Sequence, residues 1–496
     1  MNDLKYWQNK FKEKRQKTNF RDFLKEIVSW SPIMLYRNNW LISKFALTSR
    51  VNKVIHHQEF EKNMDTLLEK WTIYDFQVDF FKNYENLIWK IDLFNIISYW
   101  SNENSDYSDV VINSKNIYLS FTVINDCENV LYSFSVKDNS TNVLNSISVY
   151  QNSDNIYLWR AIVESYKVYY SSFINNSNNI WFSANLNWCS ECIFCNDLDN
   201  CSYYIKNQKY EKDDYQIEKE KILKEKHNFF KFYKEVSFVW KNNNSTNVTW
   251  SWFFNSENVE NWYFWYNVKN GRNLMFVWWI NWNENIFDAF TGWAWTSNDF
   301  YWVMWTTWEN IYSCMNIITS SNIYYCYFLT NCSFCLGCVW LKNKSYCILN
   351  KQYKKEEWQI LVNKIFTQME KDWILWNFFP AKLNPYYFND TIAGLIWGFT
   401  KEKVEKEWFM WRNETIKVDI PEWFEIIQSE NLDKYQWFDK NWNWQINKEI
   451  LKKVIKDPNW NMYKIVKPEY DFLMKHKLPL PEIHWLDRIK FGLIGK

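Results

Sequence analysis

Residues 140–157 read STNVLNSISVYQNSDNIY and contain one short unit twice. The unit places a small residue, an asparagine, a branched apolar residue and a large residue in a fixed order. Its two copies are Ser140, Asn142, Val143, Leu144 and Ser153, Asn155, Ile156, Tyr157. Outside this stretch the pattern [Ser/Cys]-x-Asn-[Ile/Val/Cys]-[Tyr/Leu]-x-[Ser/Cys] recurs in both directions, so the chain is built from repeats.

The apolar position of the unit forms two series along the chain. The first series advances by thirteen positions three times and then by twelve positions three times, through Ile117, Val130, Val143, Ile156, Val168, Ile180 and Cys192. The second series advances by eleven to fourteen positions, most often by twelve, through Trp262, Leu274, Ile286, Phe300, Ile311, Ile323 and Cys335. We therefore expect two arrays of seven units each.

The residue types and the short period predict a mainly β fold. Branched and aromatic residues favour strands, and a fixed period with recurring side chains favours stacked coils in which each unit contacts its neighbours. A two-helix repeat needs more than about 30 residues, so it is excluded. We expect two tandem β-solenoid arrays of 12–13-residue units. The period leaves open whether one unit forms a whole small coil or half of a wider one.

The two arrays are also copies of each other, at an offset of 143 in the numbering. Cys189-Ser190-x-Cys192-x-x-Cys195 aligns with Cys332-Ser333-x-Cys335-x-x-Cys338, and the match continues without a gap from Asn207 and Asn350 to Ile217 and Ile360. A charged stretch of helical character follows each array. We interpret each as a helix that caps an open solenoid end, because solenoid termini need a polar cover.

These features predict the order of the domains. We expect an N-terminal α+β module that is degenerate and ribbon-like (1–75), a connector (76–112), the first array (113–205), a capping helix (206–236), the second array (237–350), a second capping helix (351–375), a connector (376–415) and a C-terminal α+β module (416–496).

The composition is unusual in one respect. At a usage of about 7% the chain would carry about 35 glycines, but it has 7 Gly and 35 Trp. The codon UGA is read as glycine in some uncultured bacterial lineages and as tryptophan under another code table. Asn-Trp-Asn occurs around Trp282, Trp442 and Trp460, where Asn-Gly would be a strong turn signal. We expect many printed tryptophans to be glycines in the living protein, and we treat no tryptophan as an aromatic anchor.

Two sets of closely spaced cysteines are the sharpest chemical feature. Four thiolates could bind zinc or an iron–sulfur cluster, and the candidate ligands are Cys189, Cys192, Cys195, Cys201, Cys332, Cys335 and Cys338. The alternative is packing, because Cys192 continues the column of Val168 and Ile180, and Cys exchanges with Ile or Ser as a small buried residue. We favour packing, since column residues are spread along the stack, and we expect no cofactor.

Catalytic residues cannot be assigned. The five histidines are His56, His57, His227, His476 and His484. None belongs to a defensible Ser/His/Asp order, and no P-loop is visible. A β-helix hydrolase or lyase acting on polysaccharide needs paired carboxylates. The coils carry only scattered acids, such as Asp154, Asp288 and Asp299.

Several motifs resemble one uncharacterised family from candidate-phyla bacteria, often labelled "CaiB/BaiF family protein". They are the Asn/Cys/Tyr units, Asn350–Glu357, Phe378-Phe379-Pro380, Tyr74-Asp75-Phe76, and the C-terminal segment Ile465–Asp487 with its Leu-Pro-Leu-Pro sequence. The resemblance implies a repeat protein of unknown activity with zinc-ribbon cysteines near its ends. This chain departs from that pattern, because it has no Cys before Cys127 or after Cys347.

The sequence favours a non-enzymatic scaffold or binding protein whose partner is an unidentified protein or glycan. The 58 Lys+Arg balance 57 Asp+Glu, so nucleic acid is a poor partner; an RNA- or ribosome-associated factor derived from zinc-ribbon relatives remains a further alternative. The polar start of the chain shows no signal peptide, and no apolar run is long enough to span a membrane. We expect a cytoplasmic protein.

Overall fold

The computed structural model describes residues 2–15, 20–26, 28–30, 70–94, 101–105, 107–236, 310–375, 377–396, 398–413 and 424–494, with a few short isolated pieces. The chain forms two compact units. The first-array unit comprises Ile97–Val239 and Glu414–Lys496, and the second-array unit comprises Met1–Ile96 and Trp240–Asn413. Trp262, Leu274, Ile286 and Phe300, predicted to start the second array, lie outside the described residues, as do His56 and His57.

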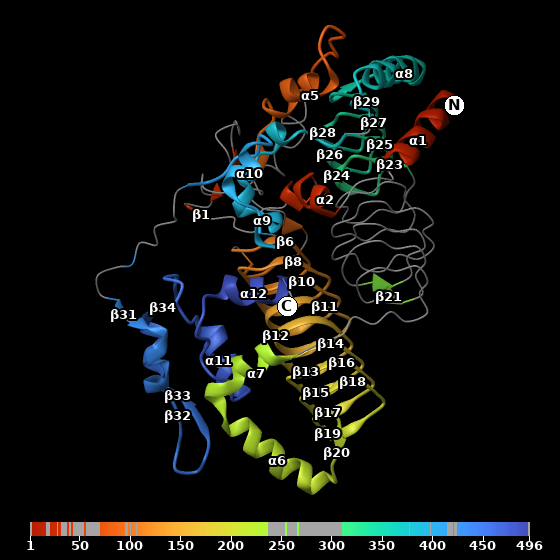
Figure 1. Ribbon diagram of the computed structural model, residues 1–496. Coiled ribbons are helices and arrows are strands. Elements are labelled where there is room, and N and C mark those ends of the chain that lie inside the picture. Colours follow the sequence, from red (N-terminus) through yellow and green to blue (C-terminus); the bar gives the residue numbers. More distant parts are fainter. Residues whose placement is uncertain are drawn as a thin grey trace. The chain divides into compact units, whose positions relative to one another are not determined.

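The first array is a parallel β-solenoid, as predicted (Figure 1). Each strand pairs in register with the equivalent strand of the next unit, for example Val143 with Ile156 and Val168 with Ile180. One stack contains β7 (Lys115–Tyr118), β9 (Glu128–Leu131), the starts of β11 (Thr141–Tyr150) and β12 (Asp154–Val163), β13 (Tyr166–Tyr169), β15 (Asn178–Trp181), β17 (Ser190–Ile193) and β19 (Ser202–Ile205).

A second strand stack completes every coil. It contains β5 (Ser98–Tyr99), β6 (Asp109–Ile112), β8 (Phe121–Ile124), β10 (Phe134–Lys137), the ends of β11 and β12, β14 (Ser172–Asn175), β16 (Ala184–Asn187) and β18 (Asn196–Asp199). Because each residue pairs with the equivalent residue of the next unit, one unit is a whole coil. The sheet starts at Ser98, ahead of the boundary expected at 113, and the apolar column extends past Cys192 to Tyr204.

The backbone turns at every third residue, and this explains the asparagine column. Lys167, Tyr170, Phe173, Asn176 and Asn179 have φ of 54, 50, 61, 46 and 55°, and most of the residues between them belong to strands. A left-handed conformation is costly for most residues but tolerated by Asn. The asparagine before the apolar position occupies such a corner in both arrays. The longer coils place two left-handed residues side by side, as at Asn125 and Asp126.

The interior of the array alternates apolar and small residues. Its core contains Val143, Ile156, Val168 and Ile174, each less than 1% exposed. The serines between the apolar columns are buried, and their hydroxyl groups form hydrogen bonds with the backbone. Ser146 Oγ donates to Leu144 O at 2.8 Å, and its backbone N–H donates to Ser133 Oγ at 3.1 Å. Small residues are therefore required at these positions, because the hydroxyl must reach the backbone of its own coil and of the next.

The second array repeats this construction in its own unit. Its strands are β23 (Ile311–Tyr312), β24 (Met315–Ile318), β25 (Ser321–Tyr324), β26 (Tyr327–Thr330), β27 (Ser333–Leu336), β28 (Val339–Lys342) and β29 (Ser345–Ile348). Each array ends in a short antiparallel strand, β20 (Gln208–Lys209) or β30 (Lys351–Gln352). Asn207 and Asn350 extend the last ladder, because each side-chain amide both accepts from and donates to a strand backbone.

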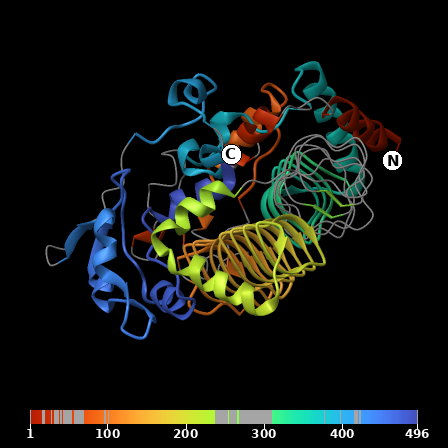
Figure 2. The same cartoon turned by 60° about the horizontal axis from the view of Figure 1, so that its bottom comes forward.

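Helices follow both arrays, as predicted. α6 (Lys212–Lys224) contacts β19, and α8 (Lys355–Lys371) contacts β29 (Figures 1 and 2). The two helices begin at equivalent positions of the duplicated sequence, and each buries an aromatic residue at the same place, Tyr215 or Trp358. Trp358 is 1% exposed, so this position holds a buried aromatic residue, although no tryptophan was expected to serve as an aromatic anchor.

Each unit contains further elements outside its array. In the first-array unit they are α7 (Phe229–Glu235), β31 (Glu425–Gln428), β32 (Gln436–Phe438), β33 (Trp444–Ile446), β34 (Lys453–Lys456), β35 (Met462–Tyr463), α11 (Lys467–Lys475) and α12 (Trp485–Ile494). In the second-array unit they include α1 (Asn2–Arg15), α2 (Phe20–Glu26), α5 (Phe80–Ile88), α9 (Ile392–Ile396) and α10 (Lys401–Glu405). Every helix among the described residues is too short or too polar to cross a membrane.

Candidate functional site

The cysteine candidates lie inside the arrays, and the structure brings three of them together. Cys189, Cys192 and Cys195 occupy successive inward positions of one coil, and all three are buried. This differs from the expectation that column residues are spread along the stack, because inward positions recur at every third residue within a coil. Cys201 lies in the next coil and is partly exposed. In the second array Cys332, Cys335 and Cys338 repeat the arrangement.

The thiols take over the structural role of serine. Cys189 Sγ donates to Asn187 O at 3.3 Å, as Ser177 Oγ donates to Asn175 O at 2.7 Å one coil earlier. Hydrogen bonds to its two neighbours raise the pKa of Cys192. The hydrogen bond from Cys192 lowers the pKa of Cys189 to about 7. Each thiol donates to a backbone carbonyl of its own coil, and Cys192 continues the apolar column of Ile180, so the three thiols complete the packing of the coil.

Metal content tests the packing interpretation of these cysteines. Among the described residues, no group of three or more His, Cys, Asp or Glu side chains has an arrangement that could hold a metal ion. A structural zinc site needs four converging ligands. We expect the purified protein to contain less than one zinc or iron atom per chain by elemental analysis. Stoichiometric metal that is lost in a Cys192→Ser variant would contradict the packing interpretation.

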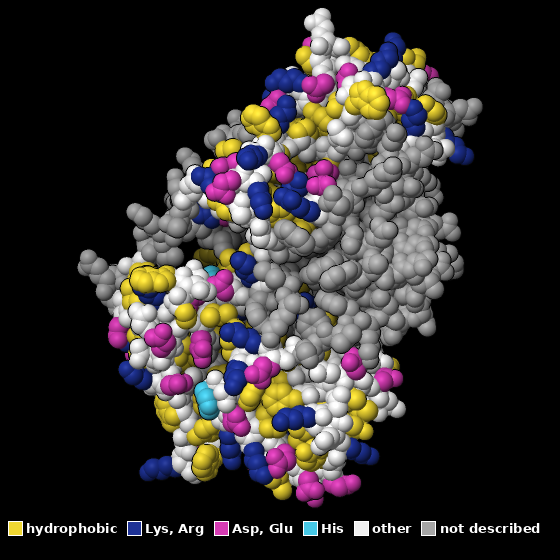
Figure 3. All heavy atoms as spheres, in the orientation of Figure 1, with side chains coloured by type: hydrophobic (Ala, Val, Ile, Leu, Met, Phe, Trp, Pro, Cys, Tyr) yellow, Lys and Arg dark blue, Asp and Glu magenta, His cyan; other side chains and the backbone are white. Residues whose placement is uncertain are grey.

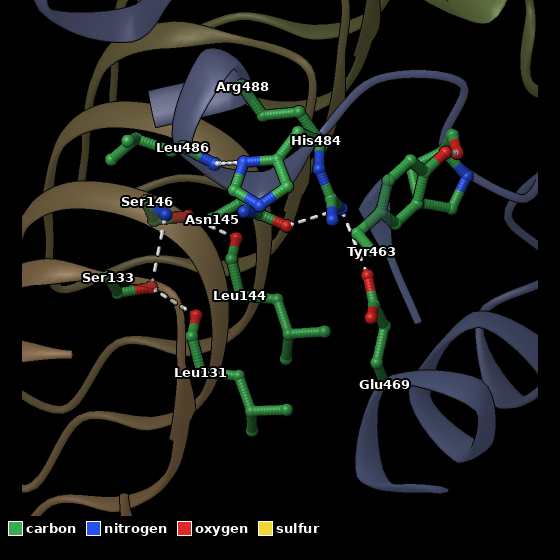
Figure 4. A network of polar contacts seen from close by, with 11 residues as sticks. Leu131, Ser133, Leu144, Asn145, Ser146, Tyr463, Glu469, His484, Leu486 and Arg488 are labelled. Carbon is green, nitrogen blue, oxygen red and sulfur yellow. Dashed lines mark hydrogen bonds and ion pairs between the residues drawn. The ribbon is translucent and has the colours of Figure 1, made fainter. Parts of the chain in front are cut away.

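A buried ion pair joins the C-terminal helices to the first array (Figure 4). Arg488 of α12 contacts Glu469 of α11 at 3.0 Å and donates to Asn145 Oδ1 of β11 at 2.7 Å. The two charged side chains are 1% and 0% exposed. Burial raises the pKa of Glu469 although Arg488 lies beside it. This network was not predicted from the sequence, because Asn145 and Arg488 are 343 positions apart.

Two histidines belong to the same interface. His484 accepts from the Leu486 N–H through Nδ1 at 3.2 Å (Figure 4). Its own backbone N–H donates to Asp457 at 3.0 Å. His476 Nδ1 lies 2.8 Å from the Tyr169 hydroxyl of β13. Burial lowers the pKa of each histidine from 6.5 to about 4. Both side chains are therefore neutral near pH 7 and act as packing and hydrogen-bonding groups.

This pKa shift predicts an acid-sensitive interface. Between pH 6.5 and about 4 the unfolded chain binds more protons at His476 and His484 than the folded chain does. The free energy of unfolding should therefore fall as the pH falls through this window. We expect a His476→Gln/His484→Gln variant to show a shallower pH dependence in urea titrations. A His227→Gln control changes an exposed residue and should keep the wild-type slope. Equal slopes in all three proteins would contradict the assignment.

One lysine has an environment that the sequence did not indicate. Lys226, between α6 and α7, is 7% exposed, and its ammonium lies 4.5 Å from the Phe229 ring centroid and 5.7 Å from that of Trp444. Burial, with Lys477 nearby, lowers its pKa to about 7. A helical lysine in a Lys/Glu-rich segment ordinarily faces solvent, so only the tertiary packing reveals this group.

The acidic candidates do not form a catalytic pair in the described coils. Asp154 accepts hydrogen bonds from Thr141, Asn142 and Asn155 at 2.7, 2.8 and 2.5 Å, so its carboxylate belongs to a ladder between coils. Asp288 and Asp299 lie outside the described residues. On the face shown in Figure 3, Lys/Arg and Asp/Glu side chains alternate without a large field of one sign.

Fold and site together define the class of this protein as a tandem β-solenoid repeat protein with helical caps. No family model, no curated protein and no solved structure matches the chain. The resemblance to the zinc-ribbon family therefore stays a prediction. A function has to be inferred from the residues themselves.

Proposed function

We propose that this protein is a non-enzymatic repeat scaffold that binds a protein or glycan partner through a polar face of its first array. The observation that supports the proposal is where the reactive groups lie. Ten of the eleven cysteines and the Arg488–Glu469 pair are buried, the two low-pKa histidines are half-buried, and these groups take part in structural hydrogen bonds or ion pairs. The solvent-facing side of the coils instead carries amides and alternating charges.

The polar face consists of Asn116, Asn129 and Asn142 with their outer neighbours; we call it the amide face. The side-chain amide of each asparagine donates to the next coil: Asn116 to Asn129 at 3.0 Å and Asn129 to Asn142 at 3.1 Å. Beside them Lys115 and Glu128 form an ion pair at 3.1 Å. Neighbouring strands lie about 4.8 Å apart, so the face presents donors and acceptors at a regular spacing. Solenoids commonly use such extended faces for binding.

The proposal can be tested with arrayed glycans and arrayed peptides. We expect saturable binding to at least one class of probe without chemical conversion of it. Thr141→Arg would place a long charged side chain on the amide face and should weaken that binding at least tenfold. Ile217→Arg is the matched control, because Ile217 is 54% exposed on α6 and lies outside the face.

Three results would overturn the proposal. Release of reducing ends from a polysaccharide would favour the β-helix hydrolase alternative. Salt-dependent retention of RNA at physiological ionic strength would favour the RNA-associated alternative. Binding that both arginine variants weaken equally would show that the amide face is not the contact surface.

A further inference from the structure

Among the described residues six tryptophans have a left-handed backbone, the conformation that suits glycine, and five of them are 62–76% exposed. The sixth, Trp340, is 7% exposed, and its ring stacks on Phe328. An indole ring exposed to water contributes little burial of apolar surface. A left-handed backbone costs free energy for any residue with a Cβ atom, but not for glycine. The five are Trp188 (φ 52°), Trp373 (58°), Trp408 (70°), Trp442 (59°) and Trp460 (68°).

Trp373 and Trp408 end helices in the motif that most often carries glycine. After α8, the Ile374 N–H donates to Met369 O at 2.9 Å and the Trp373 N–H donates to Glu370 O at 3.1 Å. After α10, Phe409 and Trp408 make the same pair of bonds to Val404 and Glu405. This pair of bonds defines the Schellman motif, whose left-handed residue is usually glycine. Lys477 has a left-handed backbone at the equivalent place after α11, so this motif alone does not indicate glycine. Trp373 and Trp408 differ from Lys477 because they also expose a large apolar ring.

Trp442 and Trp460 lie in two turns of the same design. In the first turn the Asp439 N–H donates to Asn443 O at 2.9 Å, and Asp439 Oδ1 accepts from the Asn441 and Asn443 N–H groups. The turn from Asp457 to Asn461 repeats these bonds. Both read Asp-x-Asn-Trp-Asn. A short hairpin loop of this kind ends in a left-handed residue, normally glycine.

Trp188 is a corner of the first array. The residues one coil before and after it, Asn176 and Asn200, have φ of 46 and 53°. The equivalent position in the second array is Asn331, with φ of 51°. These three equivalent positions carry asparagine, the residue that best tolerates a left-handed backbone after glycine.

Three other tryptophans show the opposite features. Trp358, Trp444 and Trp7 are 1, 6 and 4% exposed. Each indole N–H donates a hydrogen bond: to Cys347 O at 3.2 Å, to Leu478 O at 2.9 Å and to Asn363 Oδ1 at 2.8 Å, respectively. Trp358 faces Phe334 and Tyr346, and its counterpart after the first array is Tyr215, another buried aromatic residue.

We infer that Trp188, Trp373, Trp408, Trp442 and Trp460 are glycines in the living protein, and that Trp7, Trp358 and Trp444 are true tryptophans. Backbone conformation and burial thus indicate, for each of these positions separately, whether the residue is glycine or tryptophan. The assignment also changes the surface available for binding. The five exposed indoles would suggest stacking on sugars or insertion at a membrane surface, whereas the native surface lacks them.

The gene and the native protein test the assignment directly. We expect UGA codons at the five exposed positions and UGG codons at positions 7, 358 and 444. Peptide masses of the native protein should show glycine at the five positions. UGG at the five positions, or UGA at position 358 or 444, would overturn the assignment.

Stability provides a second test that is independent of the source organism. A full-length variant with glycine at all five positions should have a higher urea midpoint, because each replacement should raise the folding equilibrium constant by about five- to thirtyfold. Trp358→Gly, which removes a buried ring from α8, should lower the midpoint. A lower midpoint in the fivefold variant would contradict the inference.

Discussion

Replacement of Arg488 by alanine is expected to lower the free energy of unfolding of the first-array unit by about 3–5 kcal/mol. The change would leave the Glu469 carboxylate buried without its ion-pair partner and would remove the bond to Asn145. Hydrogen exchange of the β11 and β12 amides reports on this unit directly, because α12 contacts both strands. We expect these amides to lose protection before those of the second-array unit.

Two comparisons distinguish the buried pair from an ordinary surface pair. Lys467→Ala breaks the exposed pair with Asp471 and should change stability by less than about 1 kcal/mol. An Arg488→Met/Glu469→Leu variant removes both charges and should be more stable than Arg488→Ala. An Arg488→Ala protein as stable as the Lys467→Ala protein would mean that the C-terminal helices do not dock as described.

Replacement of Ile156 by alanine should cost about 2–5 kcal/mol. Ile156 is fully buried in the apolar column of the first array and pairs with Val143 and Val168 in the adjacent coils. Loss of its side chain would leave a cavity that the flanking coils cannot fill without breaking their register. The measurement is urea denaturation of the full chain, followed through the hydrogen exchange of β12.

Ile217→Ala is the control for this prediction. Ile217 is 54% exposed on α6, so its truncation should change stability by no more than about 0.5 kcal/mol. Equal effects at Ile156 and Ile217 would contradict the assignment of the inward columns.

Local repetition made the coils predictable from the sequence. The columns through Val143 and Ile156 recur at a short fixed distance, so strand type, inward positions and the duplication of the array could all be inferred. Whether one unit forms a whole coil could not be inferred, because the same period fits a whole small coil and half of a wider coil. The left-handed corners decide this point, since a turn at every third residue closes a small coil within a single unit.

The polar network and the aromatic anchors could not be found in the same way. Arg488, Glu469 and Asn145 belong to segments with no shared period, so only tertiary packing brings them together. Excess tryptophan pointed to an unusual composition but concealed the difference between Trp358, which is buried, and Trp373, which ends the same helix in water. Backbone conformation and exposure separate the two.

A disulfide between neighbouring coils would test the whole-coil arrangement of the first array. Ser190 and Ser202 pair in adjacent strands, with their Oγ atoms 2.6 Å apart. If one unit forms a whole coil, a Ser190→Cys/Ser202→Cys variant should form an intramolecular disulfide under mild oxidation, because adjacent strands place Cα atoms within the range of about 4.4–6.8 Å that a disulfide needs. Asn178→Cys/Ser202→Cys, two coils apart, should not. Cross-linking of the second pair but not the first would contradict the whole-coil arrangement.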